Sequence, residues 1–145
     1  LSDKLDTATR LGADRVFTPG EFAEAGMRAD VVIEAAGSAK AFEAAVAATA
    51  PGGVTVTVGL PSPDARSSIS PLGLVAEGRT IIGSYLGSAV PERDIPVFID
   101  LWRRGRLPVE ELVSSVIELE DLNSAMDALA DGQAVRQVMI FPADD

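Results

Sequence analysis

The fold is most clearly indicated by residues 30–38, which read Asp30-Val31-Val32-Ile33-Glu34-Ala35-Ala36-Gly37-Ser38. Residues 30–34 form a short apolar run of the kind found in a strand that is buried on both faces of a parallel sheet. Gly37 ends this run, and Ser38 is suited to cap a helix that continues to about Thr49. The stretch therefore predicts a strand followed directly by a helix, which is the repeating unit of α/β proteins.

The same alternation extends along the rest of the chain. We predict strands at residues 15–17, 54–58, 80–86, 113–117 and 136–141, and helices at 2–11, 21–25, 38–49, 71–77, 94–104 and 119–130. Residues 51–53 predict a turn, and residues 59–70 form a loop rich in Pro and Ser that is long enough to have a functional role. We expect an α/β fold whose mainly parallel sheet is flanked by helices.

Apolar residues at helical spacing predict which helix faces lie in the core. The predicted inner faces consist of Phe42, Ala45, Val46 and Ala48 in the helix at 38–49, of Val97, Phe98, Leu101 and Trp102 in the helix at 94–104, and of Leu122, Ala125, Met126 and Leu129 in the last helix. We interpret the last stripe as core packing rather than as a cofactor site.

The charge of the chain argues against two classes of partner. The 145 residues include 22 acidic and 12 basic side chains, which gives a formal charge of −10. Such a surface repels phosphate backbones and anionic lipids, so we predict neither nucleic-acid nor membrane binding. No apolar run reaches the roughly 18 residues of a membrane span, and no leader peptide is recognisable, so we expect a cytoplasmic protein. The chain starts at Leu1, within a predicted helix start, which suggests part of a longer protein.

The chain contains neither Cys nor His. It therefore lacks thiolates and the commonest neutral-pH base and metal ligand. Carboxylates at Glu110, Glu111, Glu118, Glu120 and Asp121 fit helix starts and turns better than an acid/base pair. We predict no catalytic residue and no metal ligand in this chain.

Motifs along nearly the whole chain resemble the zinc-containing alcohol dehydrogenases of the medium-chain dehydrogenase/reductase superfamily. The motifs, in order, are Asp3-Lys4-Leu5, Leu11-Gly12-Ala13-Asp14, residues 30–37, Pro51-Gly52-Gly53, Val58-Gly59-Leu60-Pro61, residues 83–88, Asp94-Ile95-Pro96, Gly105-Arg106-Leu107 and residues 132–136. Each motif alone is weak, and the resemblance rests on their number and order. Quinone and enoyl reductases share much of the pattern.

The resemblance implies a Rossmann-type, doubly wound fold with strand order 3-2-1-4-5-6. The sequence offers strands suited to places 3, 4, 5 and 6, but none suited to places 1 and 2, and it has no Gly-x-Gly-x-x-Gly turn. We therefore expect an incomplete NAD(P)-binding Rossmann domain at residues 1–112. Residues 113–145 would form a segment that returns to a catalytic domain.

The resemblance also implies which residues line a dinucleotide. In an open parallel sheet, ligands bind outside the carboxyl ends of the strands. The implied contacts are Ala35, Ala36, Gly37 and Ser38 on the adenosine side, and Val58, Gly59, Leu60, Ser84 and Leu86 around the nicotinamide. The alternative is that these small and aliphatic residues serve only the packing that any α/β protein needs.

Two cations are implied as further cofactor contacts. Lys4 corresponds to a family lysine at the adenosine ribose, and Arg136 to an arginine that reaches the pyrophosphate. Arg136 stands in a nearly apolar strand, where a charge without a partner would be costly. We interpret Arg79, Arg93, Arg103, Arg104 and Arg106 as ordinary surface charges. Glu34, at a buried strand end, is assigned no catalytic role.

The resemblance implies an oxidoreductase that transfers hydride between an alcohol or aldehyde and NAD or NADP. Zinc would assist in the full-length enzyme, with no ligand in this chain. The alternatives are a zinc-independent quinone or enoyl reductase, or a non-catalytic module for nucleotide binding or dimerisation. We expect a homo-oligomer formed through the strand from Ile81 to Ser88, and no activity of the isolated chain on alcohols. The choice between NAD and NADP stays open because the residue that decides it would precede Leu1.

Overall fold

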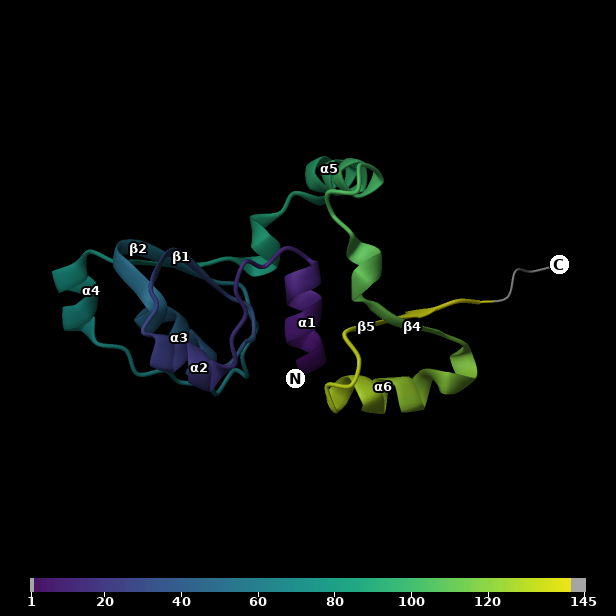
Figure 1. Cartoon of the computed structure of the whole chain (residues 1–145), viewed down its shortest axis with the longest axis horizontal. Coiled ribbons are helices and arrows are strands. Elements are labelled where there is room, and N and C mark those ends of the chain that lie inside the picture. The colour runs from purple at the N-terminus through teal and green to yellow at the C-terminus, as the bar shows by residue number, and fades with distance from the viewer. Residues whose placement is uncertain (1, 142–145) are drawn as a thin grey trace. The chain divides into compact units, whose positions relative to one another are not determined.

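The computed structural model describes residues 2–141 and divides the chain into two compact units (Figure 1). Unit 1 comprises Leu1–Val16 with Pro91–Asp145, and unit 2 comprises Phe17–Val90. This division is based on contacts within the chain. The boundary predicted at residue 112 separates the Rossmann domain from a segment expected to return to a catalytic domain, and it stays a prediction. The last four residues of the predicted segment 113–145 lie outside the described residues.

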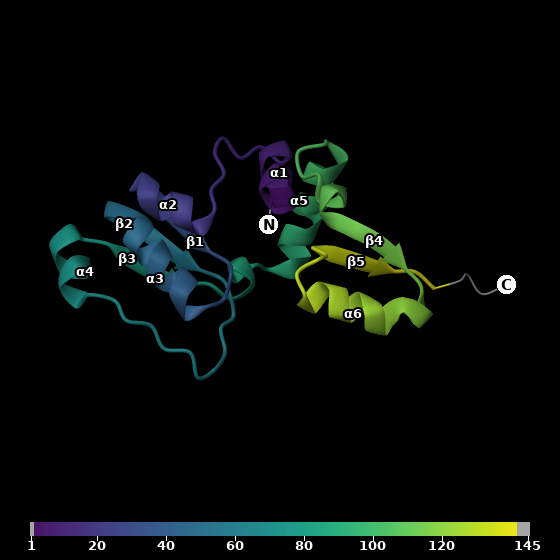
Figure 2. The same ribbon diagram turned by 60° about the horizontal axis from the view of Figure 1, so that its bottom comes forward.

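Unit 2 is a parallel sheet with helices between its strands, as Figure 2 shows. Its elements are α2 (Pro19–Ala25), β1 (Ala29–Glu34), α3 (Ala39–Ala48), β2 (Thr49–Thr57), α4 (Pro71–Glu77), β3 (Thr80–Gly83) and the 3-10 helix η1 (Tyr85–Ser88). The strands lie in the order β1-β2-β3, and both pairs are parallel. This is the arrangement expected of strands 4, 5 and 6, and it confirms an incomplete α/β fold.

Local sequence explains where the helices of unit 2 begin. The hydroxyl of Ser38 accepts a hydrogen bond from the amide of Ala41 at 3.2 Å, so Ser38 caps α3 as predicted. At α2, Thr18 and Glu21 form a reciprocal capping box, in which the Glu21 carboxylate accepts from the Thr18 amide at 2.8 Å. These bonds satisfy amides that have no acceptor inside the helix.

The core of unit 2 lies between α3 and the sheet. Ala45, Val46 and Ala48 are buried on the inner face of α3, as expected. Behind them Thr49 and Thr55 are fully buried and share a hydrogen bond of 2.6 Å between their hydroxyls. A pair of buried hydroxyls is tolerated here because each has a partner.

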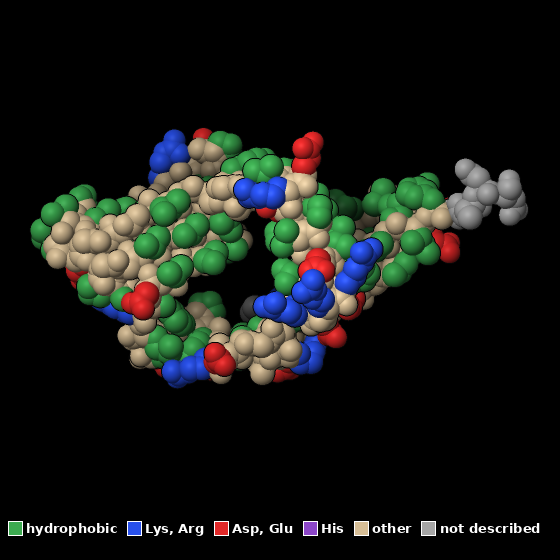
Figure 3. Space-filling model, turned by 90° about the horizontal axis from the view of Figure 1, so that it is seen from above, with side chains coloured by type: hydrophobic (Ala, Val, Ile, Leu, Met, Phe, Trp, Pro, Cys, Tyr) green, Lys and Arg blue, Asp and Glu red, His purple; other side chains and the backbone are tan. Residues whose placement is uncertain are grey.

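The opposite face of the sheet is exposed in unit 2. Val31 and Ile33 alternate with the residues that face α3, and their side chains are 61% and 67% exposed. Hydrophobic side chains are accordingly visible on the surface in Figure 3. The strands therefore bury one face only, unlike the two buried faces that the apolar run at residues 30–34 predicted.

Unit 1 contains a second, two-stranded parallel sheet. Its elements are α1 (Ser2–Arg10), α5 (Pro91–Arg103), η2 (Val109–Leu112), β4 (Val113–Ile117), η3 (Leu119–Asp121), α6 (Leu122–Ala130) and β5 (Arg136–Met139). Strands β4 and β5 are joined through α6, since parallel neighbours need a crossover connection. No helix among residues 2–141 has the length and apolarity that a membrane span requires.

Three predicted elements differ from the structure. Residues 15–17 are not a strand. In the order 3-2-1-4-5-6 they would pair with strand 2, for which the sequence offers no segment, and the sheet described for unit 2 consists of β1, β2 and β3. Residues 51–53 belong to β2, where Gly52 (φ +76°) accompanies a register shift, rather than to a turn. The strand predicted to Leu86 ends at Gly83, because Leu86 (φ +49°) and Gly87 (φ +65°) turn the backbone left-handed.

Two predicted inner faces are also wrong. On α5, Val97, Phe98 and Trp102 are exposed, and the indole nitrogen of Trp102 donates to Glu110 at 2.9 Å. The stripe on α6 buries only Ala125, and its larger members are exposed. A stripe of apolar residues is buried only where a second layer faces it, and the two strands of unit 1 make a narrow layer.

Candidate functional site

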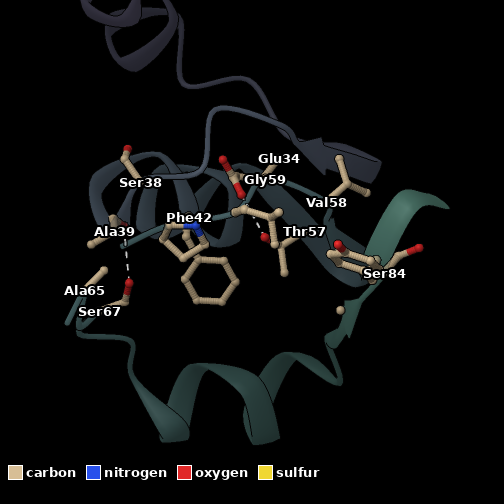
Figure 4. Close-up of a pocket in the computed structure, with 14 residues that line it drawn as sticks. Glu34, Ser38, Ala39, Phe42, Thr57, Val58, Gly59, Ala65, Ser67 and Ser84 are labelled. Carbon is tan, nitrogen blue, oxygen red and sulfur yellow. Dashed lines mark hydrogen bonds between the residues drawn. The ribbon is translucent and has the colours of Figure 1, made fainter. Parts of the chain in front are cut away.

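A cavity of about 530 Å³ lies at the carboxyl ends of β1, β2 and β3 in unit 2 (Figure 4). This edge of a parallel sheet is where α/β proteins bind ligands. The cavity is lined by Glu34, Ser38, Ala39, Phe42, Thr57, Val58, Gly59, Leu60, Pro61, Ala65, Ser67, Gly83, Ser84 and Tyr85. Glu34 is the one charged residue in this lining, so the cavity suits an uncharged, partly apolar part of a ligand.

Five of the predicted cofactor residues line this cavity: Ser38, Val58, Gly59, Leu60 and Ser84. They come from three different strand ends and are brought together by the parallel register of the sheet. The prediction that these strand ends share one edge is therefore confirmed, whereas their contact with a cofactor stays a prediction.

The other predicted residues of unit 2 lie outside the cavity lining. Ala35, Ala36 and Gly37 form the turn between β1 and the cap of α3. Leu86 lies in η1 with its side chain 73% exposed. The strand that was expected to carry Leu86 into the site is replaced there by a left-handed turn.

Glu34 joins the ends of two strands through its side chain. Its carboxylate accepts a hydrogen bond from the Gly37 amide at 2.7 Å and another from the Thr57 hydroxyl at 2.7 Å. The side chain is only 5% exposed. The bond from Thr57, followed by backbone amides, holds the pKa of Glu34 below its usual value, although burial acts in the opposite direction. The carboxylate is therefore ionised and already occupied by two donors.

Backbone bonds extend this connection to all three strand ends. The carbonyl of Glu34 accepts from the amides of Val58 at 2.8 Å and Gly59 at 3.3 Å. The carbonyl of Thr57 accepts from the Ser84 amide at 3.0 Å. The loops after β1, β2 and β3 are thus fixed relative to one another at the edge that holds the cavity.

Gly37 and Gly59 face each other across the loops after β1 and β2. A methyl group added at Gly59 would stand 2.2 Å from the Gly37 nitrogen and 2.5 Å from its Cα. Gly37 itself has φ +67°, and a methyl group there would stand 2.9 Å from the carbonyl oxygen of Leu60. From the sequence we predicted that these glycines let a ligand approach the backbone. The structure adds that the two loops need glycine at both positions to pack together.

The long loop predicted at 59–70 is held against α3 on the other side of the cavity. The Ser67 hydroxyl donates to the carbonyl of Ala39 at 3.3 Å, and the Ser68 amide donates to the Glu43 carboxylate at 2.7 Å. Figure 4 shows Phe42 of α3 directed into the space between this loop and the strand ends. The loop therefore forms one wall of the cavity.

The two predicted cations belong to unit 1. Lys4 is exposed on α1, and its Nζ lies 3.7 Å from the position that a Cβ at Gly132 would take. Arg136 is the first residue of β5 and is exposed, so its charge does not carry the burial cost that the sequence suggested. Lys4 therefore lies beside Gly132, and Arg136 follows four residues later along the chain. The role of both cations stays a prediction.

Arg79 is not the surface charge that the sequence suggested. Its side chain is 9% exposed, pairs with Glu77, and donates from Nη1 to the carbonyl of Val46 at 2.7 Å. The carbonyl of Val46, in the last turn of α3, also accepts from the amide of Thr49, so Arg79 is its second donor. Arg79 therefore caps the end of α3.

Sequence reasoning missed several lining residues, above all Phe42, Thr57 and Tyr85. Phe42 was assigned to the core, and it is half-buried and contributes to the cavity. Thr57 immediately precedes the predicted contact Val58, so its position at the strand end was a usable signal. Tyr85 was hidden by the prediction of a continuous strand.

The residues that the structure describes do not fit a zinc site. The sequence has no Cys and no His, and residues 2–141 contain no group of three or more acidic side chains placed to hold a metal ion. Zinc in proteins is held mainly by Cys and His.

A parallel α/β sheet with a cavity at the carboxyl ends of its strands places the chain among the Rossmann-like proteins. Residues 1–104 match the family model described as zinc-binding dehydrogenase. The chain therefore belongs to the zinc-binding dehydrogenase family, within the medium-chain dehydrogenase/reductase superfamily.

Similar proteins include geraniol dehydrogenase and several alcohol dehydrogenases. Geraniol dehydrogenase of Castellaniella defragrans is 35% identical over 97 residues, which cover 67% of this chain and 26% of that protein. The putative alcohol dehydrogenase D of Mycobacterium tuberculosis is 31% identical over 147 residues, which cover 94% of this chain and 40% of that protein. The chain thus spans well under half the length of these relatives.

Solved structures agree on the fold. An alcohol dehydrogenase zinc-binding domain protein from Burkholderia ambifaria superimposes with a TM-score of 0.91 at 25% identity, covering 99% of this chain and 40% of that chain. An alcohol dehydrogenase from Escherichia coli in complex with NADH gives a TM-score of 0.79 at 22% identity, covering 97% and 42%. At this identity the second likeness shows the fold alone.

Proposed function

We propose that this chain supplies part of the NAD(P) site of an alcohol dehydrogenase-like oxidoreductase. The observation that carries the proposal is the cavity at the strand ends, which five residues expected at the cofactor line together. Membership in the zinc-binding dehydrogenase family supports the same function.

The chain's own residues would bind and orient the cofactor. Val58, Gly59 and Leu60 offer backbone groups at the end of β2, and Ser84 offers a hydroxyl after β3. Because Glu34 is the one charged group in the cavity lining, the phosphates would be met elsewhere, and Lys4 and Arg136 are the proposed contacts. When bound, the nicotinamide supplies the acceptor or donor of hydride, and a group outside this chain would hold zinc at the alcohol or aldehyde.

Titration of the purified chain with NADH and with NADPH tests the proposal. Enhancement or blue shift of the nicotinamide fluorescence at micromolar to millimolar cofactor is the expected result. A chain that is folded by circular dichroism and leaves both spectra unchanged at millimolar cofactor would contradict it. The ratio of the two affinities measures the preference between NAD and NADP within this chain.

A second role as a dimerisation surface is proposed for Ile81 to Ser88. β3 is an edge strand of the sheet of unit 2, and Tyr85 and Leu86 after it are exposed. An edge strand can pair with a second copy around a two-fold axis. Sedimentation of the chain and of a Tyr85→Lys variant tests this role. A dimer that the substitution does not weaken would refute it, and so would a strictly monomeric chain.

The cytoplasmic location also stays a prediction.

A further inference from the structure

We infer that Glu34 is a positioning residue for the cofactor cleft, holding the loops after β1 and β2 in the geometry that the nicotinamide end of a dinucleotide requires. The inference rests on the proposed function and extends it to a residue that touches the cavity but was assigned no role. Figure 4 shows Glu34 and Thr57 joined at the cavity wall.

The carboxylate is matched to its two partners. The Gly37 amide can only donate, and the Thr57 hydroxyl donates in the observed arrangement. An ionised carboxylate offers acceptors at both oxygens, whereas an amide side chain offers an acceptor at one end only. Hydrogen bonds to an ionised acceptor are about twice as strong as those between neutral groups. The site is therefore built for glutamate in its charged form.

The position of the carboxylate links loops that local sequence would leave independent. Gly37 belongs to the turn before α3, and Thr57 is the last residue of β2. The carbonyl of Glu34 additionally receives the amides of Val58 and Gly59, which line the cavity. Thr57, Val58 and Gly59 are all hydrogen-bonded to Glu34, and each directly precedes a residue proposed to face the nicotinamide. Preorganised groups lose less entropy when a ligand binds, so this clamp favours affinity.

Other charges do not explain the arrangement. Of the residues that line the cavity, Glu34 alone carries a carboxylate and none is Lys or Arg. The carboxylate is therefore stabilised by hydrogen bonds from the two loops rather than by an ion pair, which ties its state directly to loop geometry.

Variants of Glu34 and Thr57 separate positioning from general stability. Glu34→Gln keeps the size of the side chain and removes its charge. Thr57→Val removes the hydroxyl, and Thr57→Ser restores it. Glu21→Gln is the matched control, because Glu21 also accepts a backbone amide and a threonine hydroxyl, from Thr18, but lies at α2 outside the cavity lining.

Amide hydrogen exchange of the whole chain is the first measurement. We expect Glu34→Gln and Thr57→Val to speed exchange at Gly37, Val58 and Gly59 by about fivefold to tenfold, which corresponds to a loss of about 1–1.4 kcal/mol. Thr57→Ser should stay within about twofold of the natural chain, and Glu21→Gln should change none of these amides. Unchanged exchange at the three amides in Glu34→Gln would overturn the inference.

NADH affinity, measured by fluorescence on the same variants, is the second measurement. We expect Glu34→Gln and Thr57→Val to weaken binding about tenfold, with Thr57→Ser and Glu21→Gln unaffected. Loosened loops with unchanged NADH affinity would overturn the role in cofactor positioning. If the natural chain binds no NADH, the proposed function fails, the cofactor role of Glu34 fails with it, and the exchange data still decide whether Glu34 holds the two loops.

Discussion

Replacing Gly59 by Ala tests whether the loops after β1 and β2 depend on their close approach. The added methyl carbon would lie 2.2 Å from the Gly37 nitrogen, more than 1 Å inside an ordinary contact of about 3.5 Å. The atoms that the methyl group would meet belong to the backbone of Gly37, whose amide is hydrogen-bonded to Glu34, so they cannot move away easily. Overpacking of this kind costs about 1–3 kcal/mol, and we expect the upper end of that range.

The opposing effect is small. Alanine restricts the unfolded chain and thereby stabilises by about 0.4–1 kcal/mol, which leaves a net loss of about 2 kcal/mol. With a urea dependence of about 2 kcal/mol per molar, the midpoint for unit 2 should fall by about 1 M. Amide NMR signals of β1 and β2 during urea titration report this transition. Fluorescence of Trp102, which lies in unit 1, reports the other unit separately.

Gly83→Ala is the matched control. Gly83 ends β3 at the same cavity, and a methyl group there would meet no atom within 4 Å among the described contacts. We expect its free energy of unfolding to stay within about 0.5 kcal/mol of that of the natural chain. If Gly59→Ala proves as stable as Gly83→Ala, the close approach of the loops after β1 and β2 does not require glycine at position 59.

Further outcomes follow from other contacts in the chain. Thr55→Val should lower the free energy of unfolding by about 1 kcal/mol, because it removes the buried bond to Thr49; Thr55→Ser should lose less, and equal losses in urea titrations would contradict this. Arg79→Ala should cost about 1 kcal/mol, because the carbonyl of Val46 loses one of its two donors, and a change below about 0.5 kcal/mol would exclude the capping role. The folded-state pKa of Glu34 lies below its unfolded value of about 4.3, so its stabilisation is full above that pH and disappears as the pH falls through the folded pKa. Stability measured from pH 6 to pH 3 should therefore fall less steeply in Glu34→Gln, and parallel curves would argue against an ionised clamp. Added zinc should leave the thermal midpoint of the chain unchanged, and we expect no turnover of alcohols with or without zinc; zinc-dependent turnover would refute that expectation.

Local sequence predicted the elements whose signals are local. The strand at residues 30–34 and the helix capped by Ser38 were both confirmed, because apolar runs and capping residues act within a few positions. The helix at 71–77 was confirmed with the same bounds. These elements place three strand ends at one edge, so the location of the cavity was predictable.

Features that depend on distant partners were not predictable. Residues 15–17 have the composition of a strand, but a strand forms only within a sheet that includes it. The left-handed turn at Leu86 breaks a run whose β-branched and aromatic residues favour an extended backbone. Exposure of Phe98 and Trp102 depends on which layer faces α5, and helical spacing alone does not contain that information.

The candidate site shows the same division. Glycines and serines at strand ends were expected as cofactor contacts from the family resemblance, and Ser38, Gly59 and Ser84 among them line the cavity. The role of Glu34 was missed, because its carboxylate is bonded to residues 3 and 23 positions away and the second bond exists only in the folded sheet. A charged residue at the end of an otherwise apolar strand was the one signal available, and it marks the point where the loops are joined.

Mapping NADH on the isotopically labelled chain by amide NMR tests the central claim most directly. We predict that shift changes concentrate at Ser38, Val58, Gly59, Leu60 and Ser84, and that they saturate with a single affinity. Changes confined to residues away from the strand ends of unit 2, or none at millimolar NADH, would contradict it.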